Sequence, residues 1–386
     1  MNGQGGGQFA PRGRSAAAVL DLLRAAGTEG ISRLELAERT GLTPQAVSKI
    51  TARLRADGLA AEAGRRASTG GKPRTVLRLV PGAGYAVGVH LDRDELRTVL
   101  VDLTGAVAGE RRVPLDLGAG SDAVVAGVAR EVTALAPGPE IGVGVALPGP
   151  LDHTRGVLHR VTGFPEWDGF PLRDALARRL GVPVVVDKDT NAAALALAVA
   201  GAGATEEGGE GGEGGEGGGG GGGGGGGEGR SFAYLHLGTG LGAGLVFDGK
   251  VHRGARTGAG EFGHQVVQLD GEPCPCGSRG CVEALCLAAV ARGDLAEAAR
   301  VLGTGAANLA GLLDIDLVLL GGRTVASAPD AFVAGVGAVL DARARREGGR
   351  DGAVPVRVAP GGERAIAEGA AHLVLAPLFG RGDAPT

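Results

Sequence analysis

The sequence is poor in aromatic residues and in long apolar runs. Aromatic side chains make up only 3% of the 386 residues, although hydrophobic residues reach 44%. A sizeable core is therefore expected, and it must consist mainly of Ala, Val and Leu. No apolar run approaches the ~20 residues that a transmembrane helix needs. The first residues are polar and lack a secretory apolar segment, so we expect a soluble cytoplasmic protein.

Cysteine is also scarce, and four residues in a chain of this length do not make a disulfide scaffold. Three of them, Cys274, Cys276 and Cys281, lie within eight residues. In a reducing compartment such clustering favours a metal site over disulfides.

Glycine, by contrast, is abundant and unevenly distributed, because 20 of the 76 glycines lie between residues 201 and 230. This Gly/Glu tract has nothing to bury, so we expect residues 201–230 to be a disordered insertion. Charge is uneven too: residues 1–85 carry a net +7 and the remainder −11. A basic N-terminal part on an acidic body predicts a polyanionic partner for that part alone.

The basic part has the pattern of a winged helix-turn-helix domain over residues 14–80, behind a disordered stretch over residues 1–13. Helices are predicted over residues 14–26 and 33–40, and Gly41 supplies the turn. Thr43 as the N-cap and Pro44 at the first position then open a helix that reaches about Asp57.

This last helix has an apolar face and a polar face. The residues expected to face the core recur at helical spacing: Val47, Ile50 and Leu54. Those left on the open face, where a recognition helix meets base edges, are Gln45, Ser48, Lys49 and Arg53. A two-stranded wing is expected to carry phosphate-binding cations: Arg65, Arg66, Lys72 and Arg74. We therefore expect operator DNA as the partner; the alternative is a helical packing module with a basic loop.

Four residues with zinc-binding side chains occur within eighteen positions: His264, Cys274, Cys276 and Cys281. Three thiolates and an imidazole complete the tetrahedral shell of a structural zinc site. Gly277 and Gly280 allow the tight turns of such a loop. The alternative is a set of free buried thiols. Cys286 lies outside the pattern and is expected in the core.

Residues 84–386 alternate strands and helices, which predicts an α/β body. Its most specific motifs are GAGEFGH at 258–264 and CPCGSRGCVE at 274–283, supported by GTGLGAGL, PGPLD, DTNAAAL and LVLLGG. With these motifs the chain resembles the ROK family of repressors and sugar kinases, and specifically its winged-helix repressor branch. The resemblance covers nearly the whole chain. It implies a two-lobed, actin-like (ribonuclease H-like) ATPase fold with the ligand between the lobes.

The resemblance also implies roles for individual residues. The zinc ligands would be the four residues above, and the zinc would be structural. The implied sugar contacts are Asp189, Asn191, Glu261, His264 and Glu283. Asp189 would stand at the general-base position of the kinases, here vestigial. The implied nucleotide-like loops are Gly238, Thr239, Gly240 and Gly242 on the phosphate side, and Gly321 and Gly322 on the adenosine side.

Departures from the kinase pattern affect the first phosphate loop and the sugar side. The small residues that let the backbone of that loop approach a phosphate are replaced by Asp92 and Arg93. Asp94 stands in place of the hydroxyl and would repel a nucleotide phosphate, so ATP with Mg²⁺ is not expected to bind. Gly163 and Lys188 stand where the family has sugar-binding amides. Lys188 reads either as a contact for an anionic group or, more commonly, as a solvated lysine.

Three functions remain open. The first is a sugar-responsive DNA-binding repressor that forms a homo-oligomer, a dimer or a tetramer. The alternative is an ATP-dependent sugar kinase that retains a DNA-binding module. The third is a ligand-independent DNA-binding protein whose body only assembles.

Overall fold

The computed structural model describes residues 13–66, 74–135, 141–161, 164–201, 231–348 and 352–381. The chain divides into two units: unit 1 comprises residues 1–196, 253–259 and 363–386, and unit 2 comprises residues 197–252 and 260–362. The segments over 1–13 and 201–230, which were predicted to be disordered, lie outside the described residues except for Gly13 and Gly201.

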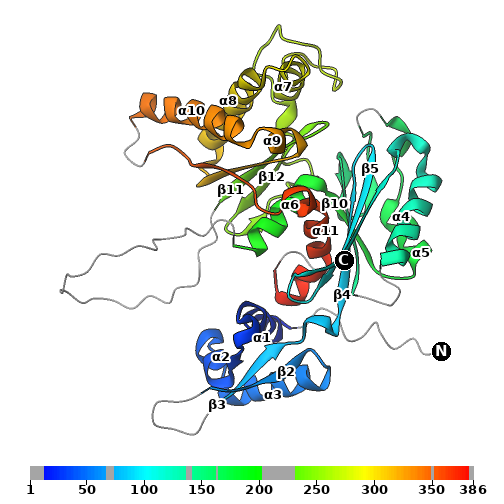
Figure 1. The fold of residues 1–386 in the computed structure, drawn as a ribbon, viewed down its shortest axis with the longest axis vertical. Helices are drawn as coiled ribbons and strands as arrows, with labels where there is room; N and C mark the ends of the chain where they lie inside the picture. The colour runs from blue at the N-terminus through cyan, green and yellow to red at the C-terminus, as the bar shows by residue number, and fades with distance from the viewer. Residues whose placement is uncertain are drawn as a thin grey trace, which may run out of the picture. The chain divides into compact units, whose positions relative to one another are not determined.

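Unit 1 begins with the predicted winged helix-turn-helix module (Figure 1). Its elements are α1 (Arg14–Ala25), β1 (Ile31–Ser32), α2 (Arg33–Thr40), α3 (Pro44–Ala56), β2 (Ala60–Arg66) and β3 (Arg74–Leu79). The three strands form an antiparallel sheet in the order β1-β3-β2. The predicted start of α3 is confirmed, since the Thr43 hydroxyl accepts a hydrogen bond from the Ala46 N–H. At the start of α2, Ser32 forms a capping box with Glu35.

The body of unit 1 is a five-stranded sheet in the order β10-β7-β4-β5-β6. Its strands are β4 (Tyr85–Leu91), β5 (Glu95–Asp102), β6 (Val107–Pro114), β7 (Gly142–Leu147) and β10 (Val184–Lys188), with a small hairpin of β8 (Leu151–Asp152) and β9 (Val157–Leu158) beside it. Strands β4, β5 and β6 pair antiparallel, whereas β7 and β10 run parallel to β4. Figure 1 shows α4 (Ser121–Leu135) and α5 (Leu172–Leu180) on one face of this sheet and α11 (Ala365–Leu375) on the other.

Helix α11 packs directly on the backbone of β4 and β7, at two glycines. A Cβ added at Gly88 of β4 would lie 1.9 Å from the Ala367 carbonyl oxygen, and one at Gly144 of β7 would lie 1.7 Å from that of Ala370. Any side chain at either glycine would therefore push the helix off the sheet. Helix α11 and the 3₁₀ turn η7 (Ala376–Phe379) that continues it share one hydrophobic cluster with β4 and β5 and with α1 and α3 of the DNA-binding module.

Unit 2 is built on a second five-stranded sheet in the order β13-β12-β11-β14-β15. Its strands are β11 (Phe232–Leu237), β12 (Leu241–Phe247), β13 (Lys250–Val251), β14 (Leu317–Gly321) and β15 (Val356–Val358). The helices that pack on it or on one another are α7 (Val282–Ala291), α8 (Leu295–Leu313), α9 (Arg323–Ser327) and α10 (Pro329–Glu347). Helix α6 (Asp189–Val199) runs across the sequence boundary of the two units.

The expected architecture is confirmed: a winged helix-turn-helix module precedes an α/β body built on two five-stranded sheets with helices. Among the described residues, no helix combines the length and the hydrophobicity that crossing a bilayer requires.

His372 of α11 is a buried titratable group inside this packing. Burial, together with the nearby Arg24 guanidinium, lowers the pKa of His372 from 6.5 to about 4. Between these two values the unfolded chain binds a proton that the folded chain does not. Stability should therefore fall as the pH is lowered from about 6.5 towards 4, by up to ~1.4 kcal/mol per pH unit from this residue.

We expect His372→Leu to flatten this part of the pH profile of urea unfolding. His252→Leu, which replaces an exposed histidine, is the control and should leave the profile steep. Equal slopes in His372→Leu and the wild type would contradict the assignment.

Candidate functional site

The predicted recognition helix α3 has its predicted polar face exposed. Val47 and Leu54 are buried, and Ile50 is half-buried and packs against the same core. The four side chains of the open face are exposed: Gln45, Ser48, Lys49 and Arg53. A further inward residue was not predicted: buried Thr51 accepts a hydrogen bond of 3.3 Å from Arg33 Nε and thereby links α3 to α2.

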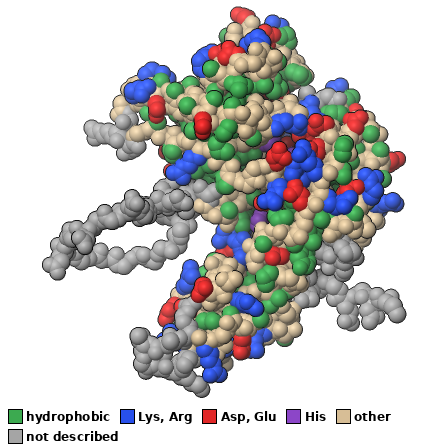
Figure 2. Space-filling model, viewed as in Figure 1, with side chains coloured by type: hydrophobic (Ala, Val, Ile, Leu, Met, Phe, Trp, Pro, Cys, Tyr) green, Lys and Arg blue, Asp and Glu red, His purple; other side chains and the backbone are tan. Residues whose placement is uncertain are grey.

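The wing is described in part. Arg65 on β2 and Arg74 on β3 are exposed, and Arg66 pairs with Arg74 in the strand register. Lys72 lies outside the described residues. On the face shown in Figure 2, Lys and Arg side chains are scattered over this module with a few acidic ones between them. Basic side chains are thus present on this face of the module, where they can contact phosphates.

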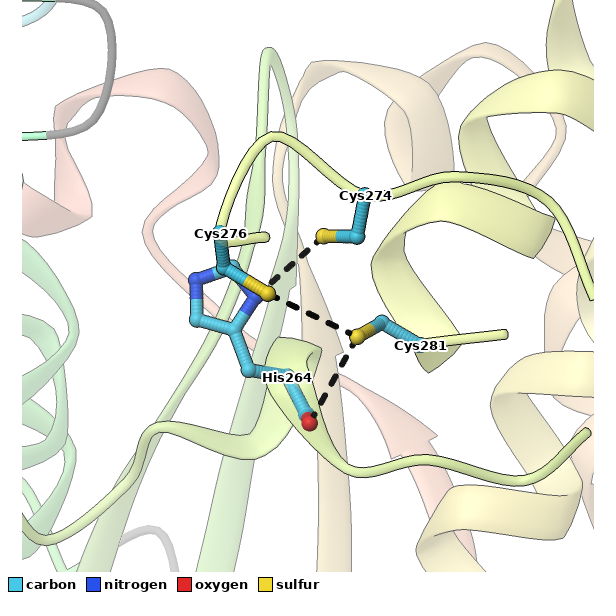
Figure 3. Close-up of side chains that lie close together, drawn as sticks. All are labelled: His264, Cys274, Cys276 and Cys281. Atoms are coloured by element: carbon cyan, nitrogen blue, oxygen red, sulfur yellow. Dashed lines mark hydrogen bonds between the residues drawn. The ribbon is translucent and has the colours of Figure 1, made fainter. Parts of the chain in front are cut away.

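His264, Cys274, Cys276 and Cys281 form a candidate metal centre in unit 2, with their ligand atoms all within 4.8 Å of one another (Figure 3). Cys276 Sγ lies 3.8 Å from Cys281 Sγ, and Cys274 Sγ lies 3.6 Å from His264 Nδ1. With Zn–S of ~2.3 Å and Zn–N of ~2.0 Å, the edges of a tetrahedral site are about 3.8 Å between sulfurs and about 3.6 Å between sulfur and nitrogen. The cluster therefore has the dimensions of a Cys₃His zinc site.

The chemistry of the donor set points the same way. Burial raises the pKa of the Cys274 thiol to about 12 and also raises that of Cys281. Such thiols stay protonated unless a cation compensates the thiolate charge, and a bound zinc does so. Gly280 lets the loop close, since a Cβ there would lie 1.6 Å from the Gln268 carbonyl oxygen.

The metal loop leads directly into the phosphate-like loop of unit 2. Cys281 is the N-cap residue of α7, and Glu283 lies in the first turn of that helix. Glu283 Oε2 accepts a hydrogen bond of 2.7 Å from the Leu241 N–H, within the GTGLG segment. Glu283, a predicted sugar contact, is thus already bonded to the backbone of the predicted phosphate loop. The negative charge of its carboxylate disfavours a phosphate there.

The other predicted residues of unit 2 lie in loops or near the ends of strands and helices. Glu261 is exposed and directly precedes the 3₁₀ turn η5 (Phe262–His264). The phosphate-side loop residues Gly238, Thr239 and Gly240 connect β11 to β12, and Gly242 lies in β12. On the adenosine side, Gly321 ends β14 and Gly322 is the N-cap of α9.

Asp189 and Asn191, the predicted sugar residues of unit 1, follow β10. Asp189 is half-buried and opens α6, where its carboxylate accepts a hydrogen bond of 2.6 Å from the Thr190 N–H. Asn191 is fully buried and donates to Asp187 Oδ1 at 2.9 Å, while its own side-chain oxygen has no hydrogen-bond partner among the described residues.

Lys188 is not the solvated lysine that is the commoner case. Its side chain is buried, and its Nζ donates to the Ala259 carbonyl oxygen at 2.5 Å. Beside it, Arg253 Nε donates to the buried Asp187 carboxylate at 2.6 Å. The sequence analysis did not predict the pair of Arg253 and Asp187, because two residues 66 positions apart form no local sequence pattern. Gly163, the other departure on the sugar side, lies outside the described residues.

Contacts within the chain occupy the backbone N–H groups of the altered first phosphate loop. The Asp92 N–H donates to the Glu95 carbonyl oxygen at 2.9 Å, and Asp92 Oδ1 accepts from the Arg93 N–H at 2.8 Å. The Arg93 guanidinium lies 5.7 Å from the ring centroid of Phe164. Two backbone N–H groups that a phosphate loop would offer to oxyanions are therefore already bonded within the chain.

Comparison with known proteins agrees with this arrangement. The ROK family model matches residues 86–208 and 224–292, and a winged helix-turn-helix DNA-binding model matches residues 18–60. The xylose repressor of Bacillus subtilis (strain 168) is 26% identical over 258 residues, which are 66% of this chain and 61% of the repressor. The chain thus spans about three fifths of the curated repressors it matches.

Two solved structures resemble the fold. A ROK family transcriptional regulator, described as a homolog of the Escherichia coli MLC protein, aligns with a TM-score of 0.71 at 21% identity, over 95% of this chain and 96% of its own. A ROK glucokinase from Streptomyces griseus, solved with glucose and AMPPNP, aligns with a TM-score of 0.58 at 25% identity, over 75% of this chain and 99% of its own. The chain belongs to the ROK family and carries an N-terminal winged helix-turn-helix module.

We predict that wild-type protein holds about one zinc ion per chain and that Cys276→Ser loses it, because a structural site needs all four ligands. Unit 2 should then unfold at a lower temperature, since the binding energy of a structural zinc is folding energy. Metal analysis and thermal unfolding measure the two effects. Cys286→Ala is the control, because Cys286 is buried outside the cluster, where it donates to Ala298. Full zinc content in Cys276→Ser would refute the site.

Proposed function

We propose that the chain is a sugar-responsive DNA-binding transcriptional repressor. The exposed polar face of α3, presented by a capped helix-turn-helix with a basic wing, carries this proposal. Gln45 and Ser48 lie in the first turns of α3, where a recognition helix reaches base edges. Lys49, Arg53, Arg65 and Arg74 are exposed cations suited to phosphates, and we assign Arg66 and Lys72 the same role.

The ROK body supplies the sensor in this proposal. We assign zinc to the His264 and cysteine cluster as a structural ion that fixes the start of α7 and with it Glu283. The sugar contacts would come from Asp189 and Asn191 of unit 1 and from Glu261, His264 and Glu283 of unit 2. Carboxylates and amides suit this role because they accept hydrogen bonds from sugar hydroxyls.

Assembly of two copies completes the proposal. Helix-turn-helix dimers read two half-sites about one helical turn apart, so we expect a near-palindromic operator. A sugar that binds one arrangement of the units better than the other would shift the population and change the affinity for DNA.

A sugar kinase is the second candidate. Asp189, at the general-base position of the kinases, is the first residue of α6. The GTGLG loop is present between β11 and β12. The first loop opposes this function, because the Asp92 carboxylate accepts the Arg93 N–H, a backbone group that a phosphate loop would offer to an oxyanion. Phosphoryl transfer depends on positioning and on charge stabilisation, and Asp189 alone supplies neither.

Replacing Lys49 should weaken DNA binding without changing sequence preference. Lys49→Ala removes one phosphate contact and should lower the slope of log affinity against log salt by ~0.9. Affinity for a duplex selected from a random pool is measured as a function of salt. Lys250→Ala, an exposed lysine on β13, is the control and should keep the wild-type slope. If the wild type selects no duplex at all, the repressor proposal fails.

Purified zinc-loaded protein should not release ADP from ATP with any monosaccharide of a broad panel. Sugar-dependent ADP release that disappears in Asp189→Asn would reclassify the chain as a kinase. The triple variant Asp92→Gly, Arg93→Gly, Asp94→Thr tests whether the first loop is the cause. Gain of ATP binding by this variant is the expected result.

A further inference from the structure

The three cysteines of the metal cluster differ in their access to solvent. Cys276 is exposed, whereas Cys274 and Cys281 are buried. Next to Cys276 the loop is also open, because a Cβ added at Gly277 would meet nothing within 4 Å. A small oxidant in solution therefore reaches the Cys276 sulfur first, and the loop around this sulfur has space to adjust.

A second thiol lies within reach of the first. Cys276 Sγ is 3.8 Å from Cys281 Sγ, and Figure 3 shows the two side chains directed toward each other. The S–S bond of a disulfide is ~2.05 Å long, so the two sulfurs would have to approach by about 1.8 Å. The exposed part of the loop at Cys276 can supply this shift. Cys281 is held more firmly, because it pairs with Val266 in a β-bridge and is the N-cap residue of α7.

Cys274 is the less suitable partner for Cys276. Only Pro275 separates the two cysteines along the chain, and a disulfide across a single residue closes a small, strained ring. The Cys274 N–H also donates to the Ser278 carbonyl oxygen at 2.9 Å, which fixes the backbone of Cys274 within the turn. The geometry therefore favours Cys281 as the residue that reacts with an oxidised Cys276.

We propose that Cys276 and Cys281 form a reversible disulfide when hydrogen peroxide reaches the cluster, and that this modification releases zinc and loosens the start of α7. The disulfide rests on the exposure of Cys276 and on the positions of the two sulfurs. The release of zinc rests in addition on the proposed zinc site.

The chemistry balances with hydrogen peroxide as the oxidant. The Cys276 thiolate attacks one peroxide oxygen, so that an S–O bond forms, the O–O bond breaks and hydroxide leaves. The Cys281 thiolate then attacks the Cys276 sulfur, so that an S–S bond forms, the S–O bond breaks and a second hydroxide leaves. The two cysteines lose two electrons and the peroxide gains them. Two of the four metal ligands are then joined to each other, and the remaining two do not make a tetrahedral structural site.

The start of α7 carries the effect to the phosphate-like loop. Glu283 in the first turn of α7 accepts a hydrogen bond of 2.7 Å from the Leu241 N–H, and Cys281 caps the same turn. Movement of Cys281 toward Cys276, together with loss of the metal, would displace this turn and weaken the bond to Leu241. The Leu241 amide is therefore an internal reporter of the modification, because its hydrogen exchange depends on that bond.

Peptide mapping of the full-length, zinc-loaded protein after peroxide treatment tests the disulfide. Trypsin cleaves after Arg279 and thereby separates Cys276 from Cys281, on peptides over residues 257–279 and 280–292. The expected disulfide links these two peptides, and dithiothreitol should separate them again. Peptides that stay unlinked while the thiols are oxidised would overturn the proposal.

The other cysteines on these peptides are the controls. Cys274→Ser keeps the proposed pair and should still link the peptides, whereas Cys276→Ser should not. Cys286→Ala removes the buried thiol outside the cluster and should link as the wild type does. In the wild type, fragmentation of the linked species at the bond between Cys274 and Pro275 identifies the linked sulfur without any substitution. A link carried by Cys274 would contradict the assignment.

Metal analysis and hydrogen exchange of the same samples test the consequences. About one zinc ion should leave for each disulfide formed, since a structural site needs all four ligands. The Leu241 amide should exchange at least ~3-fold faster in the linked protein, while amides of α10 stay unchanged. Zinc retained in the linked protein, or an unchanged Leu241 amide, would overturn the effect on α7. If the untreated protein holds no zinc, the proposed zinc site fails, and the peptide map still decides whether the disulfide forms.

Discussion

Helix α11 lies closer to the central sheet of unit 1 than any side chain on the facing positions of β4 and β7 would permit. Gly88 and Gly144 make this approach possible, and the small residues of α11 complete it. The helix, the sheet and α1 thereby contribute to one hydrophobic cluster. A DNA-binding module joined in this way is part of the hydrophobic core of the body, and its position follows that of the sheet.

A second constraint orders the chemistry of unit 2. The four-residue metal cluster ends at Cys281, which is the N-cap residue of α7, and the Glu283 carboxylate on that helix accepts the Leu241 N–H. The metal loop and the phosphate-like loop are therefore linked by a single turn of helix. A zinc ion held by these four residues would fix the start of α7 and would thereby position Glu283.

Local sequence patterns allowed correct prediction of structure where the residues involved lie close together in the sequence. Thr43, Pro44 and Gly41 define the turn and caps of the helix-turn-helix within a few positions, and the metal cluster spans eighteen residues. Contacts between distant segments left no such trace. Arg253 with Asp187, Arg97 with Glu363 and Asp21 with Arg381 depend on which strands and helices become neighbours. Lys188 was misjudged for the same reason, since its acceptor is the backbone of Ala259.

Three described residues that depart from the kinase pattern, Asp92, Arg93 and Lys188, make contacts within unit 1. The Asp92 carboxylate accepts the Arg93 N–H, the Arg93 guanidinium lies over the ring of Phe164, and Lys188 donates to Ala259. Buried or half-buried charges that merely replaced catalytic groups would be left without partners, at a cost of several kcal/mol each. Here the replacements form the hydrogen bonds that hold the loop and the segment over residues 253–259. The residues that stand in place of the kinase pattern thus contribute to the internal contacts of unit 1.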